Sequence, residues 1–261
     1  MMLGGCSNPG MNGSPTPPSS RRFLLQAGLM SCLSPAWTRP LVAGIGAAAG
    51  SAAAASNPAQ AAAAAPDTSA DPGPALAPMS DGPFYPPRSW RERWDDWDAD
   101  LTRVRRNNSE QRARGQWLGL EARVLDSQGK PLDNAEVEIW QCDALQSYHH
   151  PRVNVQPTQI DSGFQGFGAT RSDRQGQLRF LTIKPVPYPG RTPHIHVKLR
   201  HASFGELSSQ LFVAGEGDNA GDFLWRRLNA QQQAAQTMQL QPAAADSGLR
   251  WMAQQVLRVP A

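Results

Sequence analysis

Short segments with alternating apolar and polar residues dominate the chain after residue 116. Within 117–124, Leu118, Leu120 and Val124 fall on one side of an extended backbone, while Glu121 falls on the other. A period of two is typical of a strand that buries one face. The same alternation returns in 135–139, 178–182, 195–199 and 211–213.

Turn sequences separate these predicted strands. The stretch 126–129 (DSQG) is one of them, and glycine and proline punctuate the later intervals. Several short strands with such punctuation predict an all-β sandwich, whose first two strands we expect to pair as a hairpin. Helices are expected to be minor and confined to parts of 90–106 and 223–239.

The beginning of the chain lacks the periodicity of a folded domain. Arg21 and Arg22 precede an apolar run that reaches Leu33, and an alanine-rich stretch follows at 43–65. Paired arginines, a short apolar core and small residues are the layout of a twin-arginine export signal. We therefore predict a signal region at 1–56 and export to the periplasm or the extracellular space.

A disordered linker is predicted at 57–80, because its Ala, Pro, Asp and Ser content cannot bury a core. The folded domain is expected to span 81–261. We do not expect a membrane span in the signal region. Gly28 and Pro35 interrupt its apolar run well before the roughly 20 residues that a bilayer requires.

Charge and cysteine content exclude several classes of function. The formal net charge is only +3, and the arginines form no basic stripe interleaved with aromatic residues, so nucleic-acid binding is not expected. Cys6 and Cys32 lie in or before the predicted signal, which leaves Cys142 in the mature protein. An internal disulfide and a cysteine metal cage are therefore excluded.

Two histidines and two tyrosines are the candidates for metal chemistry. His194 and His196 are two positions apart in a predicted strand, so both imidazoles should project to one face. Tyr188 comes shortly before them in the proline-rich stretch 185–189, where flanking prolines restrict the backbone and aim the phenol. Tyr148 follows an earlier strand by a few residues.

This donor set has a metal preference. Phenolate oxygen is a hard, anionic donor, which suits a hard trivalent ion such as Fe(III). A nearby cation also allows a phenol, with its usual pKa of about 10, to bind as the anion at neutral pH. The alternatives are two half-buried tyrosines with hydrogen-bonded hydroxyls and a pair of surface histidines that bind no metal.

Four stretches carry a resemblance to a known family. They are 137–141 (VEIWQ), 163–168 (GFQGFG), 182–189 (TIKPVPYP) and 191–196 (RTPHIH). Together with Tyr148 they resemble the intradiol ring-cleavage dioxygenases, the family of the catechol and protocatechuate 3,4-dioxygenases. The resemblance covers roughly residues 81–215 and implies a β-sandwich with an iron site in its loops.

The resemblance implies an activity and a set of metal ligands. Non-haem Fe(III) would be held by four side chains, and a catechol-type aromatic diol would be opened by O2 to a muconate-type dicarboxylic acid. Tyr148 is the implied tyrosine ligand that stays throughout turnover, and Tyr188 is the one that leaves when substrate binds. His194 and His196 are the implied imidazole ligands.

Further site residues are implied in the same way. Arg191 matches the family's arginine beside the substrate ring, where a fixed cation can stabilise developing negative charge. Gln210 matches a glutamine near the iron. Residues 82–85 (GPFY) match the stretch that lines the substrate cleft, with Gly82 and Pro83 as the implied substrate contacts. The structural alternatives are a solvated loop arginine for Arg191 and a polar side chain bonded to backbone for Gln210.

The chain departs from the family pattern in two places. The protocatechuate enzymes carry a longer insertion between the residues matching Tyr188 and Arg191, and a tryptophan where this chain has Gly190. The helical dimerisation segment of the catechol enzymes is also missing. Substrate identity cannot be transferred, therefore, and a homo-oligomer is left open.

Two other classes of protein are weighed against this interpretation. One is a secreted, non-catalytic binding module similar to the transthyretin-like domains, which would not need two tyrosines beside a His-x-His pair. The other is a zinc hydrolase that uses His194 and His196. Such an enzyme would normally need a third histidine or carboxylate ligand, and phenolates fit it poorly.

Overall fold

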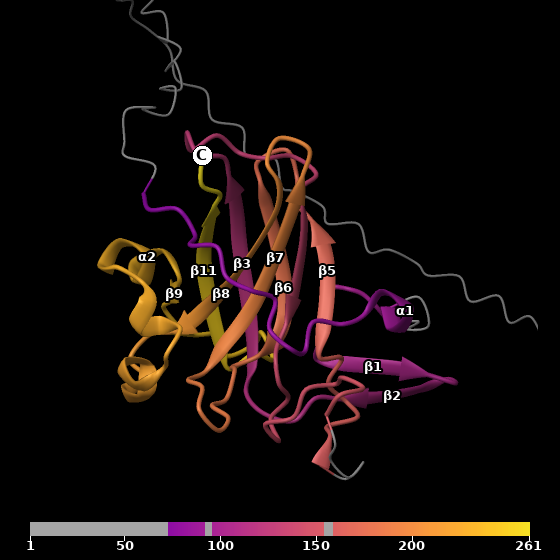
Figure 1. Ribbon diagram of the computed structural model, residues 1–261. Helices are drawn as coiled ribbons and strands as arrows, with labels where there is room; N and C mark the ends of the chain where they lie inside the picture. Colours follow the sequence, from indigo (N-terminus) through magenta and orange to yellow (C-terminus); the bar gives the residue numbers. More distant parts are fainter. Residues whose placement is uncertain (1–72, 92–95, 154–158) are drawn as a thin grey trace, which may run out of the picture. The chain divides into compact units, whose positions relative to one another are not determined.

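The computed structural model describes residues 73–91, 96–153 and 159–261, and the predicted signal region lies outside them. Strands make up most of the regular secondary structure of these residues (Figure 1). They are β1 (Arg103–Arg106), β2 (Ser109–Arg112), β3 (Trp117–Leu125), β4 (Glu136–Trp140), β5 (Phe167–Arg171), β6 (Gln177–Ile183), β7 (His194–His201), β8 (Gly205–Val213), β9 (Thr237–Met238), β10 (Gln241–Pro242) and β11 (Trp251–Arg258).

Two sheets face each other across a hydrophobic core, so the predicted all-β sandwich is confirmed. One sheet has the strand order β10-β11-β3-β6, and the other has the order β5-β4-β7-β8-β9. Leu118 and Leu120 of β3 meet Val137 and Ile139 of β4 in this core, and all four are almost fully buried. Burial of apolar side chains from both inner faces stabilises the sandwich.

The predicted hairpin between the first two long strands is wrong. β3 pairs with β11 and β6, whereas β4 pairs with β5 and β7 in the other sheet. The turn at 126–129 therefore leads from one layer to the other. Alternation identifies which face of a strand is buried, but it does not identify the neighbouring strand.

The predicted linker ends earlier than residue 80. Leu76 is 1 % exposed and Ala77 is 6 % exposed, and both belong to buried hydrophobic clusters. The Leu76 N–H donates to the carbonyl of Arg258, and the Met79 N–H donates to that of Ser208. The ordered domain therefore includes these residues, which the alanine- and proline-rich composition concealed.

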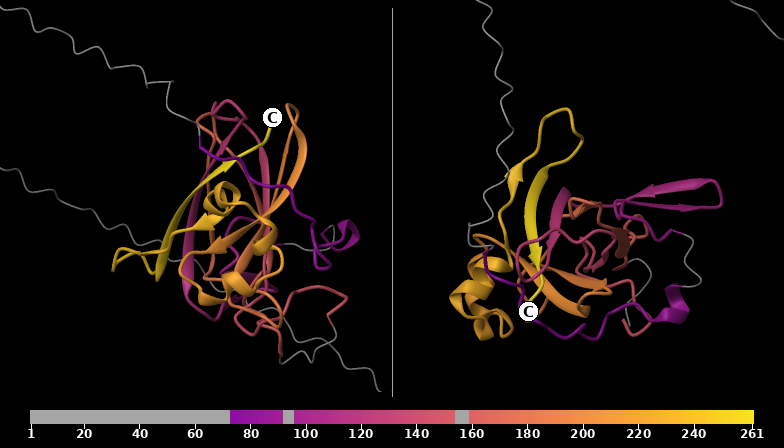
Figure 2. Two further views of the ribbon diagram at one scale, coloured as in Figure 1. Left: turned by 60° about the vertical axis from the view of Figure 1, so that its left-hand side comes forward. Right: turned by 90° about the horizontal axis from the view of Figure 1, so that it is seen from above.

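Residues 76–85, named the N-terminal segment here, begin in the core at Leu76 and then cross the outer face of the five-stranded sheet, where Asp81 bonds Lys198 (Figure 1, indigo). The β1–β2 hairpin projects from the sandwich, as two views agree (Figures 1 and 2).

Helices are short, as predicted. They are α1 (Arg88–Arg91), η2 (Gly217–Gly221), η3 (Trp225–Arg227) and α2 (Ala230–Ala235). η3 and α2 fall within the predicted stretch 223–239, whereas η2 precedes it. The other predicted stretch, 90–106, is largely wrong, because α1 reaches only its first residues and 103–106 form β1. Among the described residues, no helix is long and apolar enough to cross a membrane.

Candidate metal centre

The two histidines occupy the outer face of β7. Ile195 and Val197 enter the core between the sheets, while His194 and His196 project to the opposite face with ring centroids 5.0 Å apart. This is the arrangement that the strand period predicts. Both imidazoles are nevertheless buried, with 2 % and 4 % of their surface exposed, because loops and the N-terminal segment cover them.

A compact loop after β4 places Tyr148. The carboxylate of Asp143 accepts hydrogen bonds from the backbone N–H groups of Leu145, Ser147 and Asp161, and it lies 3.4 Å from the Nε2 atom of His149. These bonds fix the turn that precedes Tyr148. Asp143 and His149 therefore support the loop that carries Tyr148.

A two-residue turn places Tyr188. The backbone groups of Tyr188 and Arg191 bond to each other across Pro189 and Gly190. Gly190 has φ +82°, a left-handed conformation that glycine adopts without steric cost. The short connection that departs from the family pattern is therefore a tight Pro-Gly turn, and it aims the phenol toward the histidines.

The two phenols and the two imidazoles converge. The Tyr148 hydroxyl lies 3.4 Å from the Nε2 atom of His194. The ring centroids of Tyr148 and Tyr188 are 5.7 Å apart, those of Tyr188 and His194 are 5.5 Å apart, and those of Tyr148 and His196 are 6.2 Å apart. Four donor side chains from three separate stretches of sequence thus share one location.

Neighbouring groups orient both imidazoles. The Nδ1 atom of His194 lies 2.6 Å from the carbonyl oxygen of Thr192, an arrangement that places the proton on Nδ1 and leaves the Nε2 lone pair available. His196 stacks on Trp140, with ring centroids 4.8 Å apart and an interplanar angle of 12°. Its Nδ1 atom is buried and has no hydrogen-bond partner among the described residues.

Burial controls the protonation of the four side chains. It lowers the pKa of His194 to about 4, and the nearby Arg191 guanidinium contributes. Burial likewise lowers the pKa of His196 well below its usual range, so both rings are neutral and can donate a lone pair at pH 7. Burial also raises the pKa values of Tyr148 and Tyr188, so both phenols keep their protons unless a cation offsets that cost.

The residues fit a ferric ion. Two neutral imidazoles and two phenols that need a cation in order to ionise are a mixed nitrogen and oxygen set, and phenolate favours a hard trivalent metal. The described residues contain no group of three or more His, Cys, Asp or Glu side chains arranged for a metal. A carboxylate-rich or thiolate site is therefore not the arrangement found in this part of the chain.

Arg191 lies beside the four donors and is held from two sides. Its Nε atom donates to the Asp222 carboxylate at 2.8 Å, and one Nη atom donates to the side-chain oxygen of Gln210 at 2.5 Å. The other Nη atom lies 3.4 Å from the Tyr188 hydroxyl. The structure thus brings Arg191 and Gln210 to the cluster and fixes a cation next to Tyr188.

Asp222 is a site residue that the sequence analysis missed. Its side chain is fully buried, and it also accepts bonds from the backbone N–H groups of Thr192, Leu224 and Trp225. An aspartate before a helical stretch indicates a helix cap, which is the only signal available from sequence. Its ion pair with Arg191 depends on the fold.

The predicted cleft residues lie next to the donors. Gly82 has φ +72°, and a Cβ atom built on it would lie 3.4 Å from the Cε1 atom of His196. Gly82 and Pro83 are exposed, so they can meet a ligand from solvent. Phe84, in the same predicted cleft stretch, stacks on Tyr148 with ring centroids 4.6 Å apart. Trp140, which stacks on His196, was assigned no role from sequence.

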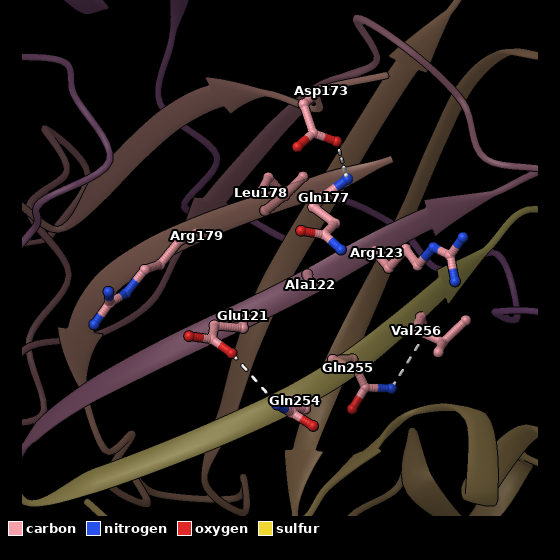
Figure 3. A pocket seen from close by; sticks show the side chains of 10 residues that line it. All are labelled: Glu121, Ala122, Arg123, Asp173, Gln177, Leu178, Arg179, Gln254, Gln255 and Val256. Carbon is pink, nitrogen blue, oxygen red and sulfur yellow. Dashed lines mark hydrogen bonds between the residues drawn. The ribbon is translucent and has the colours of Figure 1, made fainter. Parts of the chain in front are cut away.

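A separate cavity lies on the outer face of the other sheet (Figure 3). Strands β3, β6 and β11 line it with mostly polar side chains, including Glu121, Arg179 and Gln254. Glu121 accepts a hydrogen bond from Gln254 at 3.4 Å. None of the predicted site residues lines this cavity, so it is distinct from the candidate metal centre.

Comparison with known proteins relates the chain to dioxygenases. A family model described as "Dioxygenase" matches residues 82–255. The protocatechuate 3,4-dioxygenase beta chain of Burkholderia cepacia is 39 % identical over 127 residues, which are 46 % of this chain and 53 % of that protein. The catechol 1,2-dioxygenase of Acinetobacter baylyi is 30 % identical over 129 residues, which are 42 % of this chain and 40 % of that protein.

The chain therefore belongs to the intradiol ring-cleavage dioxygenase family, and the predicted resemblance is confirmed. The matches span about half or less of the curated relatives' own length.

Solved structures agree on the fold. The dioxygenase domain of a carbohydrate-binding fusion from Streptomyces sp. SirexAA-E has a TM-score of 0.52 at 23 % identity, covering 72 % of this chain and 99 % of that one. An intradiol ring-cleavage dioxygenase from Tetranychus urticae has a TM-score of 0.54 at 19 % identity, covering 71 % and 95 %. At these identities the likeness shows the fold alone.

Proposed function

We propose that this protein is a non-haem Fe(III)-dependent dioxygenase that cleaves catechol-type aromatic diols between their two hydroxyls. The observation that supports this most directly is the convergence of Tyr148, Tyr188, His194 and His196 beside the fixed cation of Arg191. These four side chains are the proposed metal ligands. The products are muconate-type dicarboxylic acids, in which both atoms of O2 are incorporated.

Bound Fe(III) would supply a Lewis-acid centre for the diol and the one-electron chemistry that O2 requires. The chain's own residues supply geometry and charge. Tyr148 is 4 % exposed and has Phe84 stacked on it, so it is suited to stay in place. Tyr188 is only half-buried, and as a phenolate its oxygen would be able to take up a proton from a substrate hydroxyl.

Arg191 is suited to stabilise negative charge on the bound diol, because its guanidinium is held in one orientation by Asp222 and Gln210. Aromatic and aliphatic side chains, including Phe84 and Val186, pack around the phenols and limit access of water. The exposed pair Gly82 and Pro83 leaves one side open, from which a flat aromatic ring can enter.

The direct test combines metal, colour and product. Purified protein loaded with Fe(III) is titrated anaerobically with a panel of catechols, and O2 is then admitted. We expect a visible phenolate-to-iron absorption band that changes with substrate, O2 uptake, and a ring-opened dicarboxylic acid identified by mass. A colourless protein that binds zinc, or one that consumes no O2 with any diol, would contradict the proposal.

Asp222→Asn tests the proposed role of Arg191. The substitution removes the charge that holds the guanidinium, so Arg191 can rotate away from the diol while the four ligands stay in place. We expect kcat/KM to fall by about 10- to 100-fold, the range for residues that support a functional group, with an unchanged iron content. Asp143→Asn is not a suitable control, since it loosens the Tyr148 loop; Glu121→Gln, on the other sheet, should leave kcat/KM unchanged.

We also propose that the protein is exported from the cytoplasm. Export through a twin-arginine signal at 1–56 is supported by Arg21 and Arg22 with the apolar and alanine-rich stretches behind them. That route carries folded proteins, so iron could be loaded before secretion. The substrates of the proposed reaction are a small aromatic diol and O2, and a homo-oligomer remains a possible assembly of the protein.

A further inference from the structure

The outer face of β7 carries one row of four side chains, two histidines followed by two basic residues. His194 and His196 lie toward one end, and Lys198 and Arg200 continue the row toward the other. Strand pairing places Trp140 and Gln210 beside His196, and it places Glu138 and Ser208 beside Lys198. A charged cluster therefore adjoins the candidate metal centre on the same surface.

Lys198 ties this surface to the N-terminal segment. Its side chain is 4 % exposed, and its Nζ atom lies 2.7 Å from the Asp81 carboxylate and 2.9 Å from that of Glu206. The Ser208 hydroxyl donates to the other oxygen of Asp81 at 2.5 Å. Asp81 is thus bound to two neighbouring strands of the sheet.

Tyr85 forms the second tie. Its hydroxyl donates to the Glu138 carboxylate at 2.6 Å and accepts from Arg200 at 2.8 Å. The Lys198 ammonium also lies 4.2 Å from the centre of the Tyr85 ring. The ring itself meets Trp140 edge-on at 4.9 Å, and Trp140 is the residue that stacks on His196.

We infer that Asp81 and Tyr85 are positioning residues that hold Gly82, Pro83 and Phe84 as one wall of the substrate cleft, through Lys198 and Arg200. Asp81 lies immediately before this three-residue wall, and Tyr85 lies immediately after it. Between them, Gly82 approaches His196 and Phe84 stacks on Tyr148. This inference rests on the proposed function and assigns a role to a charged cluster outside the ligand set.

Fold stability alone does not account for this cluster. Lys198 and Glu138 are each 4 % exposed, and burying charged groups has a desolvation cost that apolar side chains of similar size avoid. What an ion pair provides is a fixed register between two surfaces. A wall without regular secondary structure, such as 82–84, needs such anchoring on both sides.

Asp81→Asn and Glu206→Gln form a matched pair of tests. Each removes one carboxylate from Lys198, but only Asp81 belongs to the N-terminal segment. The Glu206 side chain is 51 % exposed, lies on β8 and also pairs with Arg200, so it meets both cations from within the sheet. For Asp81→Asn we expect KM for the diol to rise about tenfold, at the low end of effects for supporting residues, with kcat and iron content within about twofold. Glu206→Gln should leave KM unchanged.

A second measurement uses the iron-free protein. Amide hydrogen exchange of peptides covering 79–86 should be faster in Asp81→Asn and in Tyr85→Phe, and unchanged in Glu206→Gln. Equal KM values and equal exchange for Asp81→Asn and Glu206→Gln would overturn the inference. Exchange is measured without metal or substrate, so it decides the anchoring role even if wild-type protein cleaves no diol, a result that would refute the proposed function separately.

Discussion

Replacing Tyr148 by phenylalanine is expected to remove most of the visible absorption of the iron-loaded protein and nearly all ring cleavage. The phenol is buried and its oxygen lies 3.4 Å from His194 Nε2. Because the site around it is closed to solvent, we do not expect a water molecule to replace this oxygen as a ligand. Loss of a ligand should cost more than the roughly 10- to 100-fold seen for groups that only support one. Absorption spectra, iron content and O2 uptake check this.

Tyr85→Phe is the matched control, because the chain has three tyrosines and this one bonds Glu138 instead of facing the histidines. The control should keep the absorption band and bind iron normally. An unchanged spectrum in Tyr148→Phe would remove Tyr148 from the ligand set. Tyr188→Phe should weaken the band and alter how it responds to the diol.

Replacing Trp140 by alanine is expected to lower both stability and iron affinity. The indole is 1 % exposed, stacks on His196 and contacts Tyr85, so its loss leaves a cavity under the histidine. Truncating a buried aromatic residue costs about 3–5 kcal/mol of unfolding free energy. Denaturant unfolding of the iron-free protein measures that loss, and competition with an iron chelator measures the affinity.

Phe180→Ala separates the two effects of Trp140→Ala. Phe180 is also 1 % exposed but lies on β6, in the other sheet. It should cost a similar free energy of unfolding while leaving iron affinity close to that of the wild type. Equal iron affinities for the two variants would show that stacking by Trp140 does not orient His196.

Local sequence accounts for much of the candidate site. The period of two predicts that His194 and His196 share a face, and the prolines around Tyr188 predict a constrained loop. Pro189 and Gly190 are residues typical of the tight turn that follows Tyr188. These features depend on backbone geometry within a few residues, and residue type and spacing are sufficient to predict such geometry.

Contacts between distant stretches could not be read in the same way. The hairpin expected between the first two long strands was wrong, because alternation is equally compatible with pairing and with facing across a core. The linker boundary was misplaced, because the apolar contacts of Leu76 involve residues far away in sequence. Asp222 and Asp81 were assigned no role from sequence, because their partners Arg191 and Lys198 are distant along the chain.

The sequence by itself determined an all-β domain and the donor types that favour Fe(III), because periodicity and side-chain chemistry are local properties. The family was indicated separately, by the resemblance of four short motifs. Only the tertiary structure decided that the two phenols and the two imidazoles converge, that Asp222 holds Arg191, and that Asp81 and Tyr85 bond to the strand that carries His196. Those relations join residues up to more than a hundred positions apart. They arise because β4, β7 and β8 pair side by side and the N-terminal segment and loops cover their outer face.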